Sequence, residues 1–159
     1  MISIRDAVET DAGLILHFVR ELAIYEKAEH EVLATEDSIS KTIFGDNTGV
    51  DALICEYRNE AIGFAVYFYN YSTWLGKPGL FLEDLYVSPE HRGVGAGKAL
   101  LRHLAKIAIA QDCGRFEWNV LDWNEPSIKF YESLGATPLS EWIGYRLTGD
   151  ALRELALGT

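Results

Sequence analysis

The sequence has little cysteine and a shortage of positive charge. Cys55 and Cys113 are its two cysteines, without CxxC spacing, so neither a disulfide framework nor a zinc knuckle is expected. A reducing, cytoplasmic environment is therefore the simpler expectation. The 14 Lys and Arg residues stand against 24 Asp and Glu, which gives a net charge of −10. Because this field repels phosphate backbones and anionic lipid, we expect neither a nucleic-acid partner nor a membrane.

Long apolar runs are also missing. The longest, residues 61–69, is far shorter than the roughly 20 residues that cross a bilayer, and the first residues lack the apolar core of a targeting segment. The four histidines form no HxxxH or HExxH pair, so no metal site is expected. With 159 residues, 48% of them hydrophobic, we expect a single domain over residues 1–159.

Helical and strand patterns alternate along the chain. Apolar residues recur at helical spacing from Leu14 to Leu22 behind a Thr10 or Asp11 cap, and Thr35 is the candidate cap of a second helix. A further helix is expected to begin at residues 93–97 and to end at Gly114, and two more are expected over 125–134 and 150–157. Strands are expected over 2–7, 51–57, 61–71, 80–87, 116–121 and in a last segment up to 147. This order predicts a mixed α/β fold with an antiparallel meander.

Glycines alternate over residues 93–97, between an expected strand and an expected helix. A phosphate loop of P-loop type is excluded, because Arg92 holds its first glycine position and Ala99 its hydroxyl position. A dinucleotide fingerprint is excluded, because Lys98 holds its third glycine position. What remains is a general anion site of backbone N–H groups at a helix N-terminus. A tight turn that needs glycine for its geometry alone is the alternative.

Two adjacent carboxylates, Glu83 and Asp84, end an otherwise apolar strand. Side chains alternate along a strand, so without a bulge the two point to opposite faces and one of them enters a given cleft. The alternative is that both are charges facing solvent at the end of a strand.

The segment Arg92-x-x-Gly95-x-Gly97, after Leu85-Tyr86-Val87, resembles the acetyl-CoA motif of the GNAT superfamily of N-acetyltransferases. The chain is further similar to the spermidine/spermine (diamine) N-acetyltransferases in segments 21–26, 63–65, 74–77, 82–84 and 123–131. The resemblance implies the GNAT acyl-CoA N-acyltransferase fold, with a central, mostly antiparallel sheet flanked by helices. It also implies a homodimer.

The resemblance assigns residues to the cofactor acetyl-CoA. Main-chain amides would bind the CoA pyrophosphate along the segment Arg92, Gly93, Val94, Gly95, Ala96, Gly97 and Lys98. The backbone of Leu85, Tyr86 and Val87 would pair with the pantetheine arm. A second contact is implied for Asn124, Glu125, Pro126 and Ser127, which taken alone are typical of ordinary helix capping. Tyr131 would donate a proton to the departing sulfur, whereas taken alone it suits an aromatic core position.

The resemblance also assigns the amine substrate. An aliphatic amine has a pKa of about 10.4 and must lose a proton before it attacks a thioester, and Glu83 would accept that proton through water. The implied substrate-binding residues are Tyr25, Glu26, Glu83, Asp84, Glu117, Trp118 and Asn119. The chain departs from the diamine enzymes at Ile143, where they place a substrate-binding acid. A shorter diamine, lysine or a thialysine-like amino acid is therefore also expected as substrate.

The expected activity is transfer of the acetyl group of acetyl-CoA to a primary amine of a small polycationic or amino-acid-like substrate. Direct attack in a ternary complex is favoured, because no Cys-His or Ser-His arrangement for an acyl-enzyme is evident in the sequence. Two alternatives stay open. One is a protein or peptide lysine or N-terminal acetyltransferase, and the other is a catalytically silent acetyl-CoA-binding regulatory module.

Overall fold

A computed structural model describes residues 1–158, which fall into two compact units, Met1–Leu121 and a second unit that begins at Asp122. Each unit is described by itself. The strands, all in the first unit, are β1 (Ile2–Asp6), β2 (Val50–Tyr57), β3 (Glu60–Ser72), β4 (Lys77–Val87) and β5 (Arg115–Trp118). The α-helices are α1 (Ala12–Tyr25), α2 (Glu36–Phe44), α3 (Ala96–Ala110), α4 (Glu125–Ser133) and α5 (Gly149–Leu157). Short 3-10 turns are η1 (Glu9–Asp11), η2 (Glu29–Glu31) and η3 (Pro89–His91).

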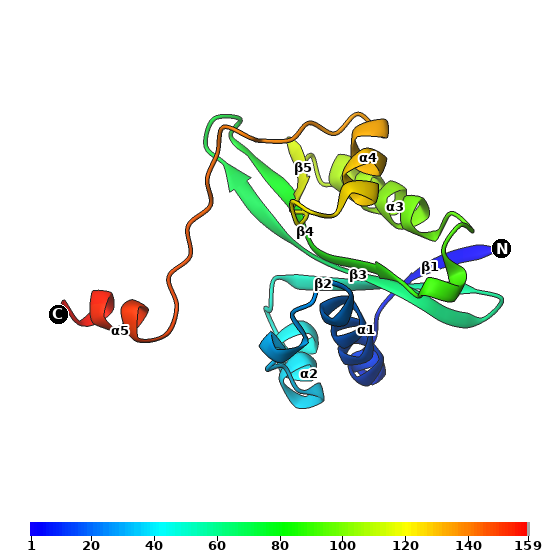
Figure 1. Cartoon of the computed structure of the whole chain (residues 1–159), viewed down its shortest axis with the longest axis horizontal. Helices are drawn as coiled ribbons and strands as arrows, with labels where there is room; N and C mark the ends of the chain where they lie inside the picture. Colours follow the sequence, from blue (N-terminus) through cyan, green and yellow to red (C-terminus); the bar gives the residue numbers. More distant parts are fainter. Residues whose placement is uncertain (159) are drawn as a thin grey trace. The chain divides into compact units, whose positions relative to one another are not determined.

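The five strands form one sheet in the order β1-β2-β3-β4-β5. The first four pair antiparallel, and β5 lies parallel beside β4. Helices α1 and α2 lie on one face of this sheet and α3 lies on the other (Figure 1). The prediction of a mixed α/β fold with a mostly antiparallel sheet flanked by helices is confirmed.

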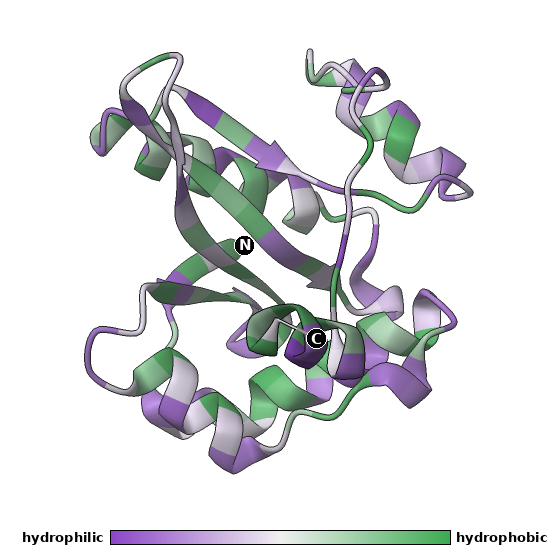
Figure 2. Cartoon of the chain, turned by 90° about the vertical axis from the view of Figure 1, so that its left-hand side faces the viewer, coloured by the Kyte–Doolittle hydropathy of each residue, from purple (hydrophilic) through white to green (hydrophobic). Residues whose placement is uncertain are grey.

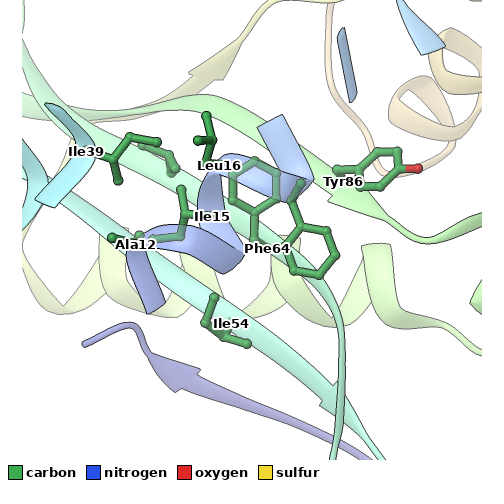
Figure 3. Close-up of a cluster of buried hydrophobic side chains, with 10 residues drawn as sticks. Ala12, Ile15, Leu16, Ile39, Ile54, Phe64 and Tyr86 are labelled. Atoms are coloured by element: carbon green, nitrogen blue, oxygen red, sulfur yellow. The ribbon is translucent and has the colours of Figure 1, made fainter. Parts of the chain in front are cut away.

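Packing between α1 and the middle of the sheet forms a core. Phe18 and Ile15 of α1 are almost fully buried, and they pack with Ile54 of β2 and Phe64 of β3 (Figure 3). The rings of Phe18 and Phe64 stack with centroids 5.5 Å apart. Full burial of one such side chain contributes about 1.5–3 kcal/mol to folding. In Figure 2 the helical ribbons change between hydrophobic and hydrophilic residues along their turns, as expected of helices with one buried side.

The starts of the first two helices differ in how they are capped. Thr35 caps α2 as predicted, because its hydroxyl accepts a hydrogen bond from the Ser38 amide at 3.1 Å. Asp11 occupies the cap position of α1 but makes no side-chain capping bond. Its carboxylate instead binds the Arg5 guanidinium at 2.8 and 3.0 Å and accepts from the Val8 amide. This ion pair fixes the connection between β1 and α1.

The second unit contains α4 and α5. The prediction of a last strand up to residue 147 is wrong, since residues 137–147 are in no strand and contain a turn in which the Trp142 amide donates to the Leu139 carbonyl at 3.1 Å. An extended segment becomes a strand only beside a hydrogen-bonded neighbour, which the apolar pattern alone does not specify. No α-helix within residues 1–158 is long and apolar enough to cross a membrane.

Candidate active site

A bulge in the β3–β4 pair sets the direction of the acidic side chains. Val66 pairs with Asp84, whereas the next residue, Tyr67, pairs with Leu82, so Glu83 is the extra residue. Asp84 therefore lies on the α1 face with Val66, and Leu82 lies on the opposite face. Glu83 itself is exposed. The predicted alternation applies to a strand without a bulge, so it does not describe this pair of carboxylates.

Two carboxylates of this region act on Asp84. Burial, followed by the nearby charges of Glu83 and Glu26, raises the pKa of the half-buried Asp84 to about 6. Burial also raises the pKa of Glu26, which follows the last residue of α1. The structure therefore brings Glu26, Glu83 and Asp84 together as one acidic cluster. Such a cluster favours a cationic occupant, because a cation would offset the repulsion that Glu83 and Glu26 exert on the charge of Asp84.

Between β4 and α3 the chain forms the predicted glycine turn. Gly93 and Gly95 have φ angles of +91° and +88°, which L side chains rarely adopt. The residues from Arg92 to Gly95 are exposed, and α3 begins directly afterwards. The first N–H groups of an α-helix have no partner within the helix, so they can bind an anion. Lys98 stands in the first turn of α3, where the helix dipole disfavours a cation unless an anion is bound nearby.

Strand β4 extends beyond its pairing with β5. The two strands pair from Gly79 to Leu82, opposite Arg115 to Trp118, and β4 then continues through the bulge to Val87. The predicted pantetheine contacts Leu85, Tyr86 and Val87 lie in this continuation, which leads directly to the glycine turn. A linear arm attached to a phosphate group at the turn could therefore run along β4. The residues present fit acetyl-CoA in this respect.

The remaining predicted residues divide between the two units. Glu117 and Trp118 are half-buried on β5, and the exposed Asn119 follows that strand. In the second unit, Asn124 is buried at the start of α4 but makes no side-chain capping bond, so the expected capping role is wrong for its side chain. Pro126 lies in the first turn of α4, and Tyr131 is half-buried in the same helix.

The structure also places together residues that sequence reasoning did not connect. The Arg92 guanidinium lies over the ring of Tyr25, at 5.3 Å from its centroid. No local pattern predicts this contact, because the two residues lie far apart in the chain and belong to different elements. The acidic cluster and the glycine turn are thereby joined through side chains.

Neither cysteine has the environment of an activated nucleophile. Both are free; Cys55 is buried in β2, and burial raises the pKa of its thiol to about 11. Burial also raises the pKa of Cys113. At neutral pH both are thiols, and a thiol is a far weaker nucleophile than a thiolate. Among residues 1–158, no group of three or more His, Cys, Asp or Glu side chains is arranged to hold a metal ion.

The mixed sheet, the bulged fourth strand and the glycine turn before a helix agree with the acyl-CoA N-acyltransferase fold that the resemblance implies. The chain belongs to the acetyltransferase (GNAT) family, whose sequence profile matches residues 17–136. The predicted membership of the GNAT superfamily is thus confirmed, and with it an acetyltransferase activity that uses acetyl-CoA as cosubstrate.

Similar proteins span almost the whole chain. A thialysine N-epsilon-acetyltransferase of Mus musculus is 37% identical over 164 residues, covering 96% of each chain. An L-ornithine N5-acetyltransferase of Arabidopsis thaliana is 30% identical and covers 96% of this chain and 86% of its own. Among solved structures, an integron cassette protein from the mobile metagenome of V. cholerae superposes with a TM-score of 0.81 and 28% identity, covering 98% and 97% of the two chains.

A first prediction concerns the effect of the half-buried Asp84 carboxylate on the folding stability of the protein. Burial and the charges of Glu83 and Glu26 raise the pKa of Asp84 to about 6 in the folded protein, against a pKa of about 3.9 in the unfolded chain. The free energy of unfolding therefore decreases as the pH rises between these two pKa values, and the loss stays constant above them. We expect Asp84→Asn to be more stable than the wild type at pH 7.5, by on the order of 2 kcal/mol, with the difference shrinking toward pH 4. Urea unfolding at several pH values measures it.

Asp11→Asn is the matched control, with the opposite sign. Hydrogen bonding to Arg5 lowers the pKa of Asp11, so its ionised form stabilises the fold above its unfolded pKa and that stability is lost in acid. This variant should be less stable than the wild type at neutral pH, and the difference in stability should shrink as the pH falls. A stability difference for Asp84→Asn that stays flat between pH 4 and 7 would contradict the burial of its charge.

A second prediction concerns the glycine turn. A Cβ at Gly95 meets nothing within 4 Å, so the cost of Gly95→Val arises from its φ of +88°. Strain of this kind amounts to about 1–3 kcal/mol and should move the amides of the turn. We expect the affinity for acetyl-CoA, measured by calorimetry, to fall at least about tenfold.

Gly76→Val supplies the control for backbone strain. Gly76 also has a positive φ, +63°, with nothing within 4 Å of its Cβ position, and it precedes the start of β4, whereas the turn follows its end. This variant should bind acetyl-CoA like the wild type. Unchanged affinity in a folded Gly95→Val protein would remove the glycine turn from the cofactor site.

Proposed function

We propose that this protein acetylates the primary amine of a small substrate that carries at least one further charged group, with acetyl-CoA as the acetyl donor. The observation that carries the proposal is the acidic cluster of Glu26, Glu83 and Asp84, at the end of α1 and in the bulge of β4. Thialysine and L-ornithine, named for two relatives, are amino acids with a terminal side-chain amine, and their chemistry suits this cluster. Diamines share that terminal amine.

We propose the following division of labour among the residues. The glycine turn binds the pyrophosphate through main-chain amides, the end of β4 pairs with the pantetheine arm, and residues 124–127 add a second contact. Acetyl-CoA supplies an acetyl group activated as a thioester. Tyr25, Asp84 and residues 117–119 join Glu26 in holding the amine substrate. Residues 1–159 would act as a single domain, which is supported by a family match over residues 17–136 that continues across the boundary between the two units.

Two proton transfers belong to this proposal. An amine with a pKa of about 10.4 is protonated at neutral pH, and Glu83, exposed at the bulge, accepts its proton through water. Tyr131 donates the phenolic proton to the departing sulfur. Direct attack by the amine is favoured over an acyl-enzyme, because the raised pKa values of both cysteines keep them in the thiol form.

The proposal extends to the state and location of the protein. We propose a homodimer, because apolar side chains are exposed toward the C-terminal end, including Leu139, Ile143, Tyr145, Leu155 and Leu157, and a second copy would cover them. Two free cysteines support a reducing cytoplasm, and the net charge of −10 argues against nucleic acid or an anionic membrane as partner.

The proposed homodimer predicts the mass in solution. Light scattering at micromolar concentration should give twice the mass of 17.8 kDa, and the monomer mass would overturn the homodimer.

The substrate proposal predicts selection for charge. Assayed with acetyl-CoA by release of free thiol, thialysine, L-ornithine and a six-carbon diamine should each exceed hexylamine in kcat/KM. The advantage should shrink as salt rises, since exposed charges are screened over about 8 Å at physiological ionic strength. Glu26→Gln should reduce the difference in kcat/KM between the diamine and hexylamine without abolishing turnover. Equal kcat/KM for the diamine and hexylamine would contradict a charge-selecting site and favour a peptide substrate.

The role of Tyr131 predicts a loss in kcat. Tyr131→Phe keeps the ring and deletes the proton donor, and removal of a general acid costs roughly 10²–10⁴-fold in rate. KM should stay within a few-fold, because the hydroxyl is proposed to bind neither amine nor cofactor. Tyr71→Phe, at a tyrosine of β3 that is 65% exposed, is the control and should keep normal turnover. Wild-type kcat in Tyr131→Phe would exclude Tyr131 from the chemistry.

A further inference from the structure

The side chain of Arg92 turns back toward the sheet. Arg92 follows η3 and directly precedes the glycine turn, with an extended backbone at φ −71° and ψ 145°. Its Nε donates a hydrogen bond to the carbonyl oxygen of Val87, the last residue of β4, at 3.3 Å. One donor of the guanidinium is therefore already engaged by the strand that carries the acidic cluster.

Two tyrosine rings flank the same guanidinium. Its central carbon lies 5.3 Å from the ring centroid of Tyr25 and 5.8 Å from that of Tyr86, both within the range of cation–π attraction. Burial, followed by the charge of Glu21, raises the pKa of Tyr86, and the charge of Arg92 acts in the opposite direction. Tyr86 is buried at one end of the core cluster, with its hydroxyl pointing away from the other labelled side chains (Figure 3). Tyr86 is thus a rigid support for Arg92.

The contact with Tyr25 connects Arg92 to the acidic cluster. Tyr25 is the last residue of α1, and Glu26 follows it directly. The charge of Glu26 acts on Asp84, so the position of the last turn of α1 affects the geometry of the acidic cluster. Arg92 is the residue that joins this turn to the glycine turn.

We propose that Arg92 is a positioning residue: by packing on Tyr25 and Tyr86, its side chain holds the end of α1, and with it Glu26, in register with the cofactor-binding turn. The pyrophosphate is then bound mainly by main-chain amides of the turn, and the Arg92 side chain organises the amine site. The role in amine binding rests on the proposed function, whereas the effect on α1 does not.

The first experiment follows amide hydrogen exchange in the last turn of α1, residues 21–26, by mass spectrometry. Removal of the cation in Arg92→Gln should speed exchange there by roughly 3- to 30-fold, as expected for the loss of contacts of this strength. Tyr25→Leu should give a similar increase, and the double variant should exceed neither single variant by much, because both remove the same contact. Arg92→Lys, which keeps a cation near the rings, should restore most of the protection and also serves if Arg92→Gln folds poorly.

Calorimetry with acetyl-CoA and kinetics with thialysine complete the test. Arg92→Gln should lower the acetyl-CoA affinity by less than threefold, raise KM for thialysine by roughly 3- to 30-fold, and leave kcat within twofold. In Arg92→Lys the KM for thialysine should return close to the wild-type value. Unchanged exchange in α1, together with an acetyl-CoA affinity lowered tenfold or more, would overturn the proposal and make Arg92 a phosphate ligand. If no small amine is acetylated, the proposed function fails, while the exchange measurement still decides the role of Arg92.

Discussion

A one-residue bulge in the β3–β4 pair is the constraint on which the candidate site depends. Before the bulge, Leu80 and Leu82 of β4 are buried on the face opposite α1, and after it Asp84 and Tyr86 lie on the α1 face. One strand therefore contributes to the hydrophobic packing on one side and to the acidic cluster on the other. The bulge also coincides with the point beyond which β4 is no longer paired with β5.

Electrostatics connects the two halves of the site. Glu26, Glu83 and Asp84 lie near the bulge, and burial disfavours the charged forms of Asp84 and Glu26, which costs stability in the free protein and favours a cation. The glycine turn has the opposite character, with exposed amides at the start of α3 and Lys98 nearby. In the proposed site, a cationic amine would bind beside Glu83 and Asp84 and an anionic cofactor at the glycine turn, along the segment from Glu83 to Lys98. Strain of this sort is common at functional sites, where stability is given up for binding.

Sequence patterns predicted much of the fold but less of the site. The α1 period from Leu14 to Leu22, the Thr35 cap and the meander were readable because they depend on local spacing. The bulge could not be predicted from the sequence, because register is a property of two paired strands and no local pattern in one strand indicates the extra residue. The strand expected up to residue 147 failed for a related reason: its apolar pattern does not specify a neighbour. The packing of Arg92 on Tyr25 joins distant segments and needs the folded chain.

The proposed cofactor site is tested most directly by NMR of the ¹⁵N-labelled protein, in which the backbone amide signals are followed during titration with acetyl-CoA. We predict that the largest shifts occur at residues 93–98, where main-chain amides would bind the pyrophosphate, with a second group at residues 85–87 along the end of β4. Because main-chain N–H groups would bind the phosphates, the signals of Gly93, Gly95 and Gly97 should be among the most affected. Binding of acetyl-CoA that leaves these three glycine signals in place and shifts another region would contradict the proposed site.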